Sequence, residues 1–228
     1  GHGDYRLIAL APASVQEMSD IVGIAFDLAC KYRNPAIIQA DGVIGQMMEK
    51  EVMPEQRTRL TDEEVIARCP WATTGRTHHR TPNIITSLEL DPAEMEKRNI
   101  HLQKKYAEIE ENEVRIEELH CEAAEYLIVA FGPCARIAQK AMEMAREEGI
   151  KVGLLRPITL WPFPSKAIAA RAAQVKGILT VELNAGQMVE DVRLAVECKV
   201  PVEHFGRLGG IVPDPDEVIT ALKEKLIK

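Results

Sequence analysis

The sequence lacks the features that most directly indicate a membrane or a nucleic acid as a partner. No segment of the 228 residues approaches about eighteen consecutive apolar residues, so we expect no membrane-spanning helix. Basic residues are also in deficit, since Lys plus Arg is 28 and Asp plus Glu is 35, which gives a formal net charge of −7. A chain with this balance has no electrostatic footprint for nucleic acid or for an anionic membrane surface.

Motifs for cofactors and metals are absent as well. The sequence contains neither Gly-x-Gly-x-x-Gly nor Gly-x-x-x-x-Gly-Lys-Ser/Thr, so dinucleotide binding is a weak hypothesis. The odd number and wide spacing of the cysteines predict no disulfide framework, zinc site or iron–sulfur site, and favour free thiols in a reducing cytoplasm. No histidine has a carboxylate or cysteine at metal-ligand spacing, and no catalytic triad can be found. We therefore assign no metal ligand and no catalytic residue. The five cysteines are Cys30, Cys69, Cys121, Cys134 and Cys198.

The start of the chain lacks both a methionine and a signal peptide. It reads Gly-His-Gly and enters a strand-like segment almost at once. We expect this start to be a cut through a longer polypeptide.

What the sequence does contain is a stretch, residues 125–193, in which three β-rich segments alternate with two helical patterns. This alternation indicates a parallel α/β sheet, whose buried strands are nearly continuous apolar runs. We predict a doubly wound parallel sheet with helices on both faces, so the fold class is α/β. The predicted strands are 126–131, 151–156, 178–183 and 201–205, and the predicted helices are 134–148, 165–175, 187–198 and one from Asp214.

The N-terminal part predicts one βαβ unit. Residues 5–11 are strand-like, Ser14 and Glu17 form a capping box for a helix ending near residues 32–35, and 36–40 is a second buried strand. Asp41-Gly42 is the expected turn after it. Because this unit is too small to hold a core alone, its sheet edge should pack on the second domain or on another copy.

The middle of the chain predicts a connector and one long charged helix. Residues 52–86 are irregular, with a short helix after Thr61. Asp91 is an N-cap before a helix of about twenty-five residues, whose narrow apolar stripe continues to Ile116. This helix supports either a coiled coil or, as we favour, a bridge between domains. The predicted domains are 1–52, 53–121 and 122–228.

Candidate site residues gather where the predicted strands end, because ligands of open α/β sheets bind beyond the carboxyl ends. Cys134 at a helix start is either an activated thiol or, as we favour, a buried inert one. Arg156 either holds a carboxylate or caps carbonyls. We expect Glu182 and Asn184 to face opposite sides, so that they cannot line one pocket without a bend. The strand-end candidates for an interface or a ligand are Gly132, Arg136, Arg156, Glu182, Asn184, Gly186 and Gln187.

Four blocks of sequence stand out, namely residues 1–8 with 10–18, residues 31–35 with 41–42, residues 153–164 and residues 182–193. Together they resemble one family, the alpha subunits of 2-oxoacid:ferredoxin oxidoreductases, in the ketoisovalerate or 2-oxoglutarate branch. The resemblance runs through essentially the whole chain and does not decide which 2-oxoacid is used. It implies that residues 1–50 are the end of a domain that embraces the thiamine pyrimidine, and that 122–228 are a transketolase-C-like domain.

The resemblance also implies an activity. Such an enzyme uses thiamine diphosphate with magnesium to decarboxylate a 2-oxoacid, passes electrons through iron–sulfur clusters to ferredoxin and forms an acyl-coenzyme A. It implies a thiamine-binding beta subunit, a gamma subunit and an iron–sulfur delta subunit as partners, and we add a homodimer of this chain as an option. No cofactor is expected to be bound fully by this chain, which should support assembly and the cofactor cleft and be inactive alone. His2 and Asp4 fall nearest the substrate region of the family, although structural loop residues are the favoured interpretation.

Two other functions stay open at this point. The chain could be a transketolase-C-like scaffold without a redox role. It could also be a coenzyme A- or nucleotide-binding module that uses the helix starts at Gly132 and Gly186.

Overall fold

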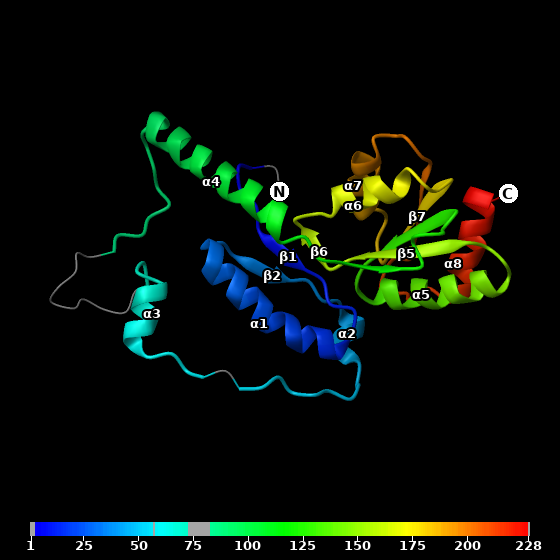
Figure 1. Ribbon diagram of the computed structural model, residues 1–228, viewed down its shortest axis with the longest axis horizontal. Helices are drawn as coiled ribbons and strands as arrows, with labels where there is room; N and C mark the ends of the chain where they lie inside the picture. Colours follow the sequence, from blue (N-terminus) through cyan, green and yellow to red (C-terminus); the bar gives the residue numbers. More distant parts are fainter. Residues whose placement is uncertain (1–2, 57, 73–82, 228) are drawn as a thin grey trace.

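The computed structural model describes residues 3–56, 58–72 and 83–227, which build two β-sheets placed side by side (Figure 1). The smaller sheet has the strand order β2-β1-β6, and the larger has the order β3-β5-β4-β7-β8. The strands are β1 Ile8–Leu10, β2 Ala36–Ile38, β3 Ile116–Leu119, β4 Tyr126–Ala130, β5 Val152–Pro157, β6 Thr159–Trp161, β7 Gly177–Glu182 and β8 Val202–Gly206.

The smaller sheet combines segments from both halves of the chain. Strands β1 and β2 are parallel and are connected by helix α1, Val15–Tyr32, which is the predicted βαβ unit. Strand β6 comes from the C-terminal half and pairs with β1 in the antiparallel sense, with Ala9 opposite Trp161. The expectation that the unit packs on the second domain is therefore confirmed.

Two details of the N-terminal unit differ from the prediction. Strand β2 is at the edge of its sheet, and the Ile37 side chain is 44% exposed, so this strand is not fully buried. Asp41 does not sit in a simple turn, because its carboxylate accepts hydrogen bonds from the backbone N–H groups of Val43 and Ile44. It thereby caps a short helix, α2, Gly42–Gln46.

The larger sheet is mixed, so the prediction of a wholly parallel sheet was wrong at one edge. Strands β5, β4, β7 and β8 are parallel, but β3 pairs with β5 in the antiparallel sense. Ile116 belongs to β3 and not to the helical stripe that we predicted. Two ion pairs stabilise β3 in addition to its backbone pairing with β5. Glu117 binds Arg156, and Glu118 binds Arg171.

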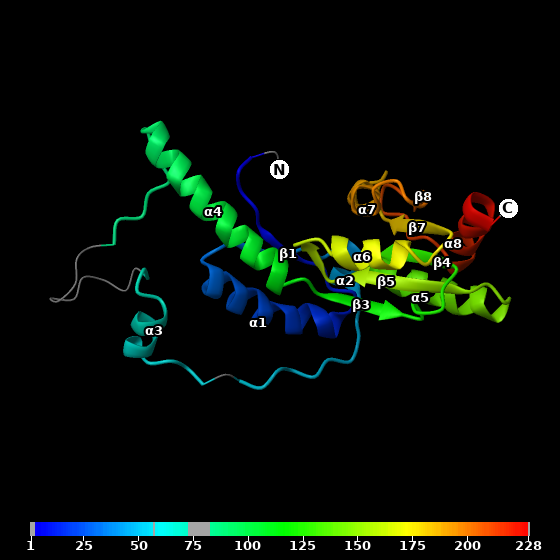
Figure 2. The same ribbon diagram turned by 45° about the horizontal axis from the view of Figure 1, so that its top comes forward.

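Helices cover both faces of the larger sheet, as the sequence predicts (Figure 2). One apolar core lies between the sheet and α5 with α8, and the other lies between the sheet and α6 with α7. No helix among the described residues is both long enough and apolar enough to cross a membrane. The covering helices are α5 Gly132–Glu147, α6 Ser165–Ala172, α7 Met188–Val196 and α8 Pro215–Leu222, and α8 continues as a π-helical turn, Lys223–Ile227.

The middle of the chain forms two helices whose starts match the predicted caps. Thr61 and Glu64 make a complete capping box at α3, Asp62–Arg68. Asp91 caps α4, Pro92–Asn112, with its carboxylate on the first backbone N–H groups. The C-terminal half of α4 packs on α1 through buried Tyr106 and Ile109, while the N-terminal half projects away from the body in both ribbon views.

Glu113, directly after α4, fastens this helix to α1. Its buried carboxylate accepts hydrogen bonds from the Tyr32 hydroxyl and from the Lys31 Nζ, both at 2.7 Å. Burial alone would raise the pKa of the Glu113 carboxyl, but the hydrogen bonds from Lys31 and Tyr32 outweigh it and lower that pKa.

Because the folded state lowers the pKa of Glu113, this residue should stabilise the protein above the ordinary carboxyl range, near pH 4, and lose that contribution as the pH falls through the lowered pKa. We expect the free energy of unfolding to fall less steeply from pH 7 to pH 3 in Glu113→Gln than in the wild type. Urea unfolding at several pH values measures this difference. Parallel pH profiles for the two proteins would contradict it.

Candidate functional site

A small cleft lies at the switch point of the larger sheet. The chain runs from β4 to β5 on one side and then to β7 on the other, so the carboxyl ends of β4 and β7 flank a crevice of the kind in which open α/β sheets bind ligands. The cleft has a volume of about 160 Å³. Three strand ends line it, namely 39–41 after β2, 131–134 after β4 and 182–184 after β7. Both halves of the chain therefore contribute to its wall.

The β4 end of the cleft contains Gly132 and Cys134. Gly132 begins α5 at φ +58°, in the left-handed region, where a side chain would be strained. Burial, together with smaller contributions from the nearby carboxylates of Asp41 and Glu182, raises the pKa of the Cys134 thiol to about 12. A buried thiol with this pKa is protonated and unreactive at neutral pH, which favours the inert interpretation of Cys134.

The β7 end of the cleft is organised by Glu182. Its carboxylate is fully buried and accepts three backbone N–H groups at the start of α7, from Gln187 at 3.1 Å, Met188 at 2.8 Å and Val189 at 3.0 Å. A helix N-terminus is a natural anion site, and here the anion is a side chain of the protein itself. The amides after Gly186 are therefore already paired.

Asn184 stabilises the same loop. Its Oδ1 accepts the Gly186 N–H at 2.7 Å, and Gly186 has φ +108°. Glu182 and Asn184 both line the cleft. We expected this only with a bend, and the chain is bent at residues 183–187, directly after β7. The premise that the two side chains of a straight strand would face opposite sides was wrong. Residues two apart in an extended chain point to the same side.

The cleft does not fit the diphosphate of thiamine diphosphate, or any phosphate. Two carboxylates, from Asp41 and Glu182, stand at its walls, and both already cap helices. A diphosphate needs cationic partners, and like charge disfavours it here. Within the described ranges, no group of three or more His, Cys, Asp or Glu side chains could hold a metal ion. We therefore derive no chemical step through thiamine diphosphate from these residues.

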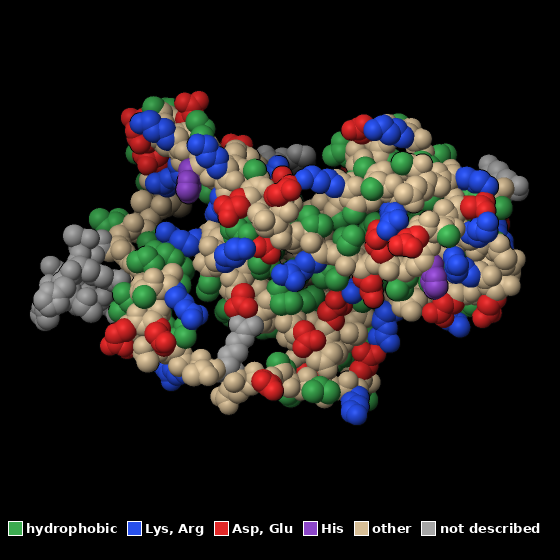
Figure 3. All heavy atoms as spheres, in the orientation of Figure 1, with side chains coloured by type: hydrophobic (Ala, Val, Ile, Leu, Met, Phe, Trp, Pro, Cys, Tyr) green, Lys and Arg blue, Asp and Glu red, His purple; other side chains and the backbone are tan. Residues whose placement is uncertain are grey.

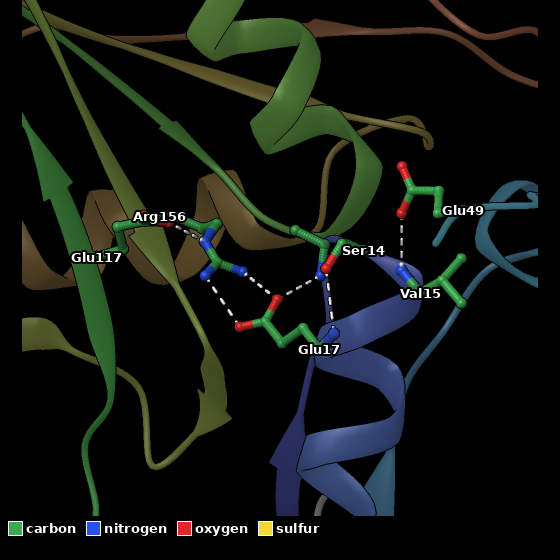
Figure 4. Close-up of polar contacts among 7 residues, drawn as sticks. Ser14, Val15, Glu17, Glu49, Glu117 and Arg156 are labelled. Atoms are coloured by element: carbon green, nitrogen blue, oxygen red, sulfur yellow. Dashed lines mark hydrogen bonds and ion pairs between the residues drawn. The ribbon is translucent and has the colours of Figure 1, made fainter. Parts of the chain in front are cut away.

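Arg156 lies outside the cleft, at the joint between the two halves of the chain (Figure 4). Its guanidinium binds both oxygens of Glu17, with Nη1 and Nη2 at 2.7 and 3.0 Å, and its Nε donates to Glu117 at 2.7 Å. Such a bidentate pair fixes orientation as well as distance. Glu17 comes from the first turn of α1 and Glu117 from β3, so one arginine holds three segments together.

Glu17 explains why the predicted capping box is incomplete. The Ser14 hydroxyl accepts the Glu17 N–H as expected, at 3.1 Å. The Glu17 carboxylate, however, accepts the N–H of Ala13 and binds Arg156, so it does not reach back to the N–H of Ser14. The sequence pattern identifies the residue but not its distant partner.

Arg136 strengthens the same joint. It forms a 2.6 Å ion pair with Glu49, whose carboxylate also accepts the Val15 N–H at 3.1 Å (Figure 4). That backbone hydrogen bond and the Arg136 charge lower the pKa of Glu49. The segment after α2 is further tied to α1, because the Gln16 side chain both donates to and accepts from the backbone of Val52.

Of the two substrate-region candidates, Asp4 is not part of the cleft. Asp4 lies beside α4, where its carbonyl oxygen is 3.5 Å from Gln103 Nε2. His2 is outside the described residues. Sequence reasoning assigned none of Asp41, Glu17 and Glu117 to a site. It placed Asp41 in a turn and Glu17 in a capping box, and Glu117 carried no local signal.

Comparison with known families covers nearly all of the chain. Residues 2–120 match the family described as "Pyruvate flavodoxin/ferredoxin oxidoreductase, thiamine diP-bdg", and residues 124–218 match "Pyruvate:ferredoxin oxidoreductase core domain II". The chain belongs to the pyruvate flavodoxin/ferredoxin oxidoreductase family. The first match alone covers more than half of the sequence.

Individual members of this oxidoreductase family are also similar. Ketoisovalerate oxidoreductase subunit VorB of Methanothermobacter marburgensis is 46% identical over 224 residues, which is 98% of this chain and 62% of the relative. 2-Oxoglutarate synthase subunit KorA of Archaeoglobus fulgidus is 30% identical over 215 residues, which is 93% of this chain and 60% of the relative. The resemblance to these alpha subunits is confirmed, although the chain spans only about three fifths of their length.

Two solved structures share the fold of this chain. The 2-oxoglutarate:ferredoxin oxidoreductase from Magnetococcus marinus, determined with 2-oxoglutarate, coenzyme A and succinyl-CoA bound, superposes with a TM-score of 0.72 at 24% identity. The alignment covers 98% of this chain and 43% of that one. A split-gene transketolase in an inactive beta4 tetramer has a TM-score of 0.53 at 14% identity, over 97% of this chain and 57% of that one. At these identities the likeness concerns the fold alone.

The internal anion at α7 predicts a specific loss of stability. Glu182→Ala removes the acceptor of three backbone N–H groups, of which those of Met188 and Val189 are buried, and we expect it to lower the free energy of unfolding by roughly 2–3 kcal/mol. Glu190→Ala, in the exposed first turn of the same helix, should change it by less than about 0.5 kcal/mol. Chemical denaturation of both variants tests this. Equal effects would show that the capping role is wrong.

The joint predicts an energetic coupling across 139 residues of sequence. In a double-mutant cycle of Arg156→Met and Glu17→Gln, we expect a coupling free energy of about 1–3 kcal/mol, because the pair is bidentate and the arginine is largely buried. The cycle with Glu117→Gln, whose side chain is 48% exposed, should give a smaller value. Unfolding free energies of the single and double variants provide the measurement. A coupling free energy near zero for Arg156 and Glu17 would contradict the role of this ion pair in holding the two halves of the chain together.

Proposed function

We propose that this chain is part of a thiamine-diphosphate-dependent 2-oxoacid:ferredoxin oxidoreductase complex. The complex would decarboxylate a 2-oxoacid oxidatively, form an acyl-coenzyme A and reduce ferredoxin. The single observation that carries the proposal is the 46% identity to VorB along 98% of the chain. The match to the thiamine-diphosphate-binding family over residues 2–120 supports it.

The substrate that we favour is the branched-chain acid 3-methyl-2-oxobutanoate (ketoisovalerate). Identity to VorB of two Methanothermobacter species is 46%, whereas identity to their 2-oxoglutarate synthase subunit KorA is 30–31% over similar lengths. This difference supports the ketoisovalerate branch over the 2-oxoglutarate branch.

We assign this chain a framing role within the complex. It places three strand ends around one cleft and locks its two halves together through Arg156 and Arg136. The cofactor set would be thiamine diphosphate with magnesium, iron–sulfur clusters and coenzyme A, held mainly by other segments or by the beta, gamma and delta partners. We retain the division at 1–52, 53–121 and 122–228, a cytoplasmic location and inactivity of the isolated chain as parts of this proposal.

The geometry weighs against the coenzyme A- or nucleotide-binding alternative. That function would need free amides at the helix starts after Gly132 and Gly186. The amides after Gly186 are paired with Glu182. The helix start at Gly132 faces a cleft that contains the carboxylates of Asp41 and Glu182. A phosphate at either start would displace or oppose a carboxylate.

Activity of the complete complex on a panel of 2-oxoacids tests the proposal, with thiamine diphosphate, coenzyme A and a viologen dye as electron acceptor. We expect kcat/KM for 3-methyl-2-oxobutanoate to exceed that for 2-oxoglutarate at least roughly tenfold, because one pocket does not serve both an apolar side chain and a carboxylate well. Omission of thiamine diphosphate is the matched control and should abolish reduction.

Two outcomes would contradict different parts of it. A preference for 2-oxoglutarate would overturn the branch assignment but not the reaction class. No dye reduction with any 2-oxoacid would overturn the redox function and leave the scaffold alternative.

A further inference from the structure

His204, in the second half of β8, is the fourth group beside the buried carboxylate of Glu182. Its Nδ1 lies 3.4 Å from Glu182 Oε1, and its side chain is 21% exposed whereas that of Glu182 is fully buried. In the parallel ladder His204 lies opposite Thr180 of β7. Thr180 and Glu182 are two residues apart on one strand, so both face the same side of the sheet as the imidazole.

The hydrogen bonds around the ring determine which of its nitrogens carries the proton. The Thr180 hydroxyl donates to the carbonyl oxygen of Glu203 at 3.2 Å, so it can only accept from His204 Nδ1, which is 3.3 Å away. The carboxylate of Glu182 is an acceptor as well. A lone pair on Nδ1 would face two acceptors, and the neutral ring therefore carries its hydrogen on Nδ1.

The loop after β7 closes over the same ring. A Cβ at Gly206 would lie 2.6 Å from His204 Nε2 and would also collide with the carbonyl oxygen of Asn184. A Cβ at Gly186 would lie 3.5 Å from His204 Cδ2. The imidazole thus fills the space between the end of β8 and the loop that leads into α7.

We propose that the contact between His204 and Glu182 is a pH-sensitive latch on the wall of the cleft that Glu182 and Asn184 line. Histidine is the side chain whose charge ordinarily changes between pH 5 and 8. Protonation places a positive charge beside the carboxylate that holds the start of α7, and the attraction is strong where water is largely excluded. The latch is therefore tight in acid and looser at higher pH.

The acidic groups around His204 favour this direction. Desolvation, followed by the charges of Glu182 and Glu190, raises the pKa of Asp191 in the first turn of α7, so the negative charge of Glu182 is felt beyond its own hydrogen bonds. Glu203 is adjacent to His204 on the strand, and its side chain faces the other side of the sheet. Figure 3 shows acidic and basic side chains interspersed on one face of the molecule, so no field of a single sign dominates that face.

The basic groups of the adjoining elements are engaged elsewhere. Arg193 of α7 donates to the carbonyl oxygen of Val202 at 3.2 Å. Arg207, directly after β8, forms an ion pair with Glu217. Strand β7 contains no basic residue. A protonated His204 is therefore the cation that these elements offer to Glu182. The latch does not depend on the proposed reaction.

Amide hydrogen exchange of the 228-residue chain between pH 5.5 and 8 tests the latch, after correction for the intrinsic exchange rate at each pH. We expect the amides of Gln187, Met188 and Val189 to be at least roughly threefold more protected at pH 5.5 than at pH 8. His204→Asn retains an N–H donor near the position of Nδ1 but does not take up a proton, so this difference should disappear in that variant.

Two further measurements separate the latch from a merely structural histidine. His101→Asn makes the same substitution at an exposed histidine of α4 and should reproduce the wild-type pH profile. A long-range ¹H–¹⁵N correlation spectrum of the wild-type chain reports the tautomer directly. It should show hydrogen on Nδ1 of His204 at pH 8 and on both ring nitrogens in acid.

Three outcomes would overturn the latch. The first is an equal pH dependence of protection in the wild type and in His204→Asn. The second is hydrogen on Nε2 of the neutral ring, because Nδ1 would then present a lone pair to Glu182. The third is protection that rises with pH, because the charged ring would then open the loop. The spectrum of the wild type decides the second outcome even if His204→Asn does not fold.

Discussion

The whole structure depends on the fact that the N-terminal βαβ unit cannot bury its own core. Strands β1 and β2 have three residues each, and α1 alone covers too little apolar surface to offset the entropy of ordering the chain. Strand β6 and the C-terminal half of α4 supply what is missing. Ile158 and Trp161 from the C-terminal half of the chain, and Tyr106 and Ile109 from its middle, complete one apolar cluster with α1. The N-terminal unit therefore depends on the rest of the chain to complete its apolar core.

The segment that completes this cluster also places the charged joint. Arg156 is the penultimate residue of β5, and β6 begins three residues later, so pairing of β6 with β1 brings Arg156 to the first turn of α1. Glu17 meets it there with both oxygens. The cleft at the switch point needs the same alignment, because Asp41 follows β2 while Gly132 and Glu182 follow strands of the other sheet. A shift between the sheets would open the joint and the cleft together.

Local signals in the sequence were sufficient for the elements but not for their partners. Thr61, Asp91 and Asp214 are N-caps, and the groups with which each of them interacts lie no more than three residues further along the chain. The sequence alone therefore predicts those helix starts. The antiparallel edge was missed because Ile116 continues the seven-residue spacing of α4, and nothing local shows that the chain leaves the helix at Asn112. The partner of Glu17 lies 139 residues away, and no periodic pattern reports such a distance.

The cleft shows how this α/β fold differs from one that binds phosphate by itself. A start of a helix beyond a parallel strand normally offers free amides to a ligand, and that was the basis for considering a coenzyme A or nucleotide site. Here Glu182 extends from the end of β7 into the start of α7 and takes those amides, while Asp41 takes the amides of α2. The N-terminal amides of α7 and α2 are therefore used to hold the two loops in place. The strand ends are thereby fixed in position without being available for a phosphate, which is consistent with the framing role that we propose for this chain.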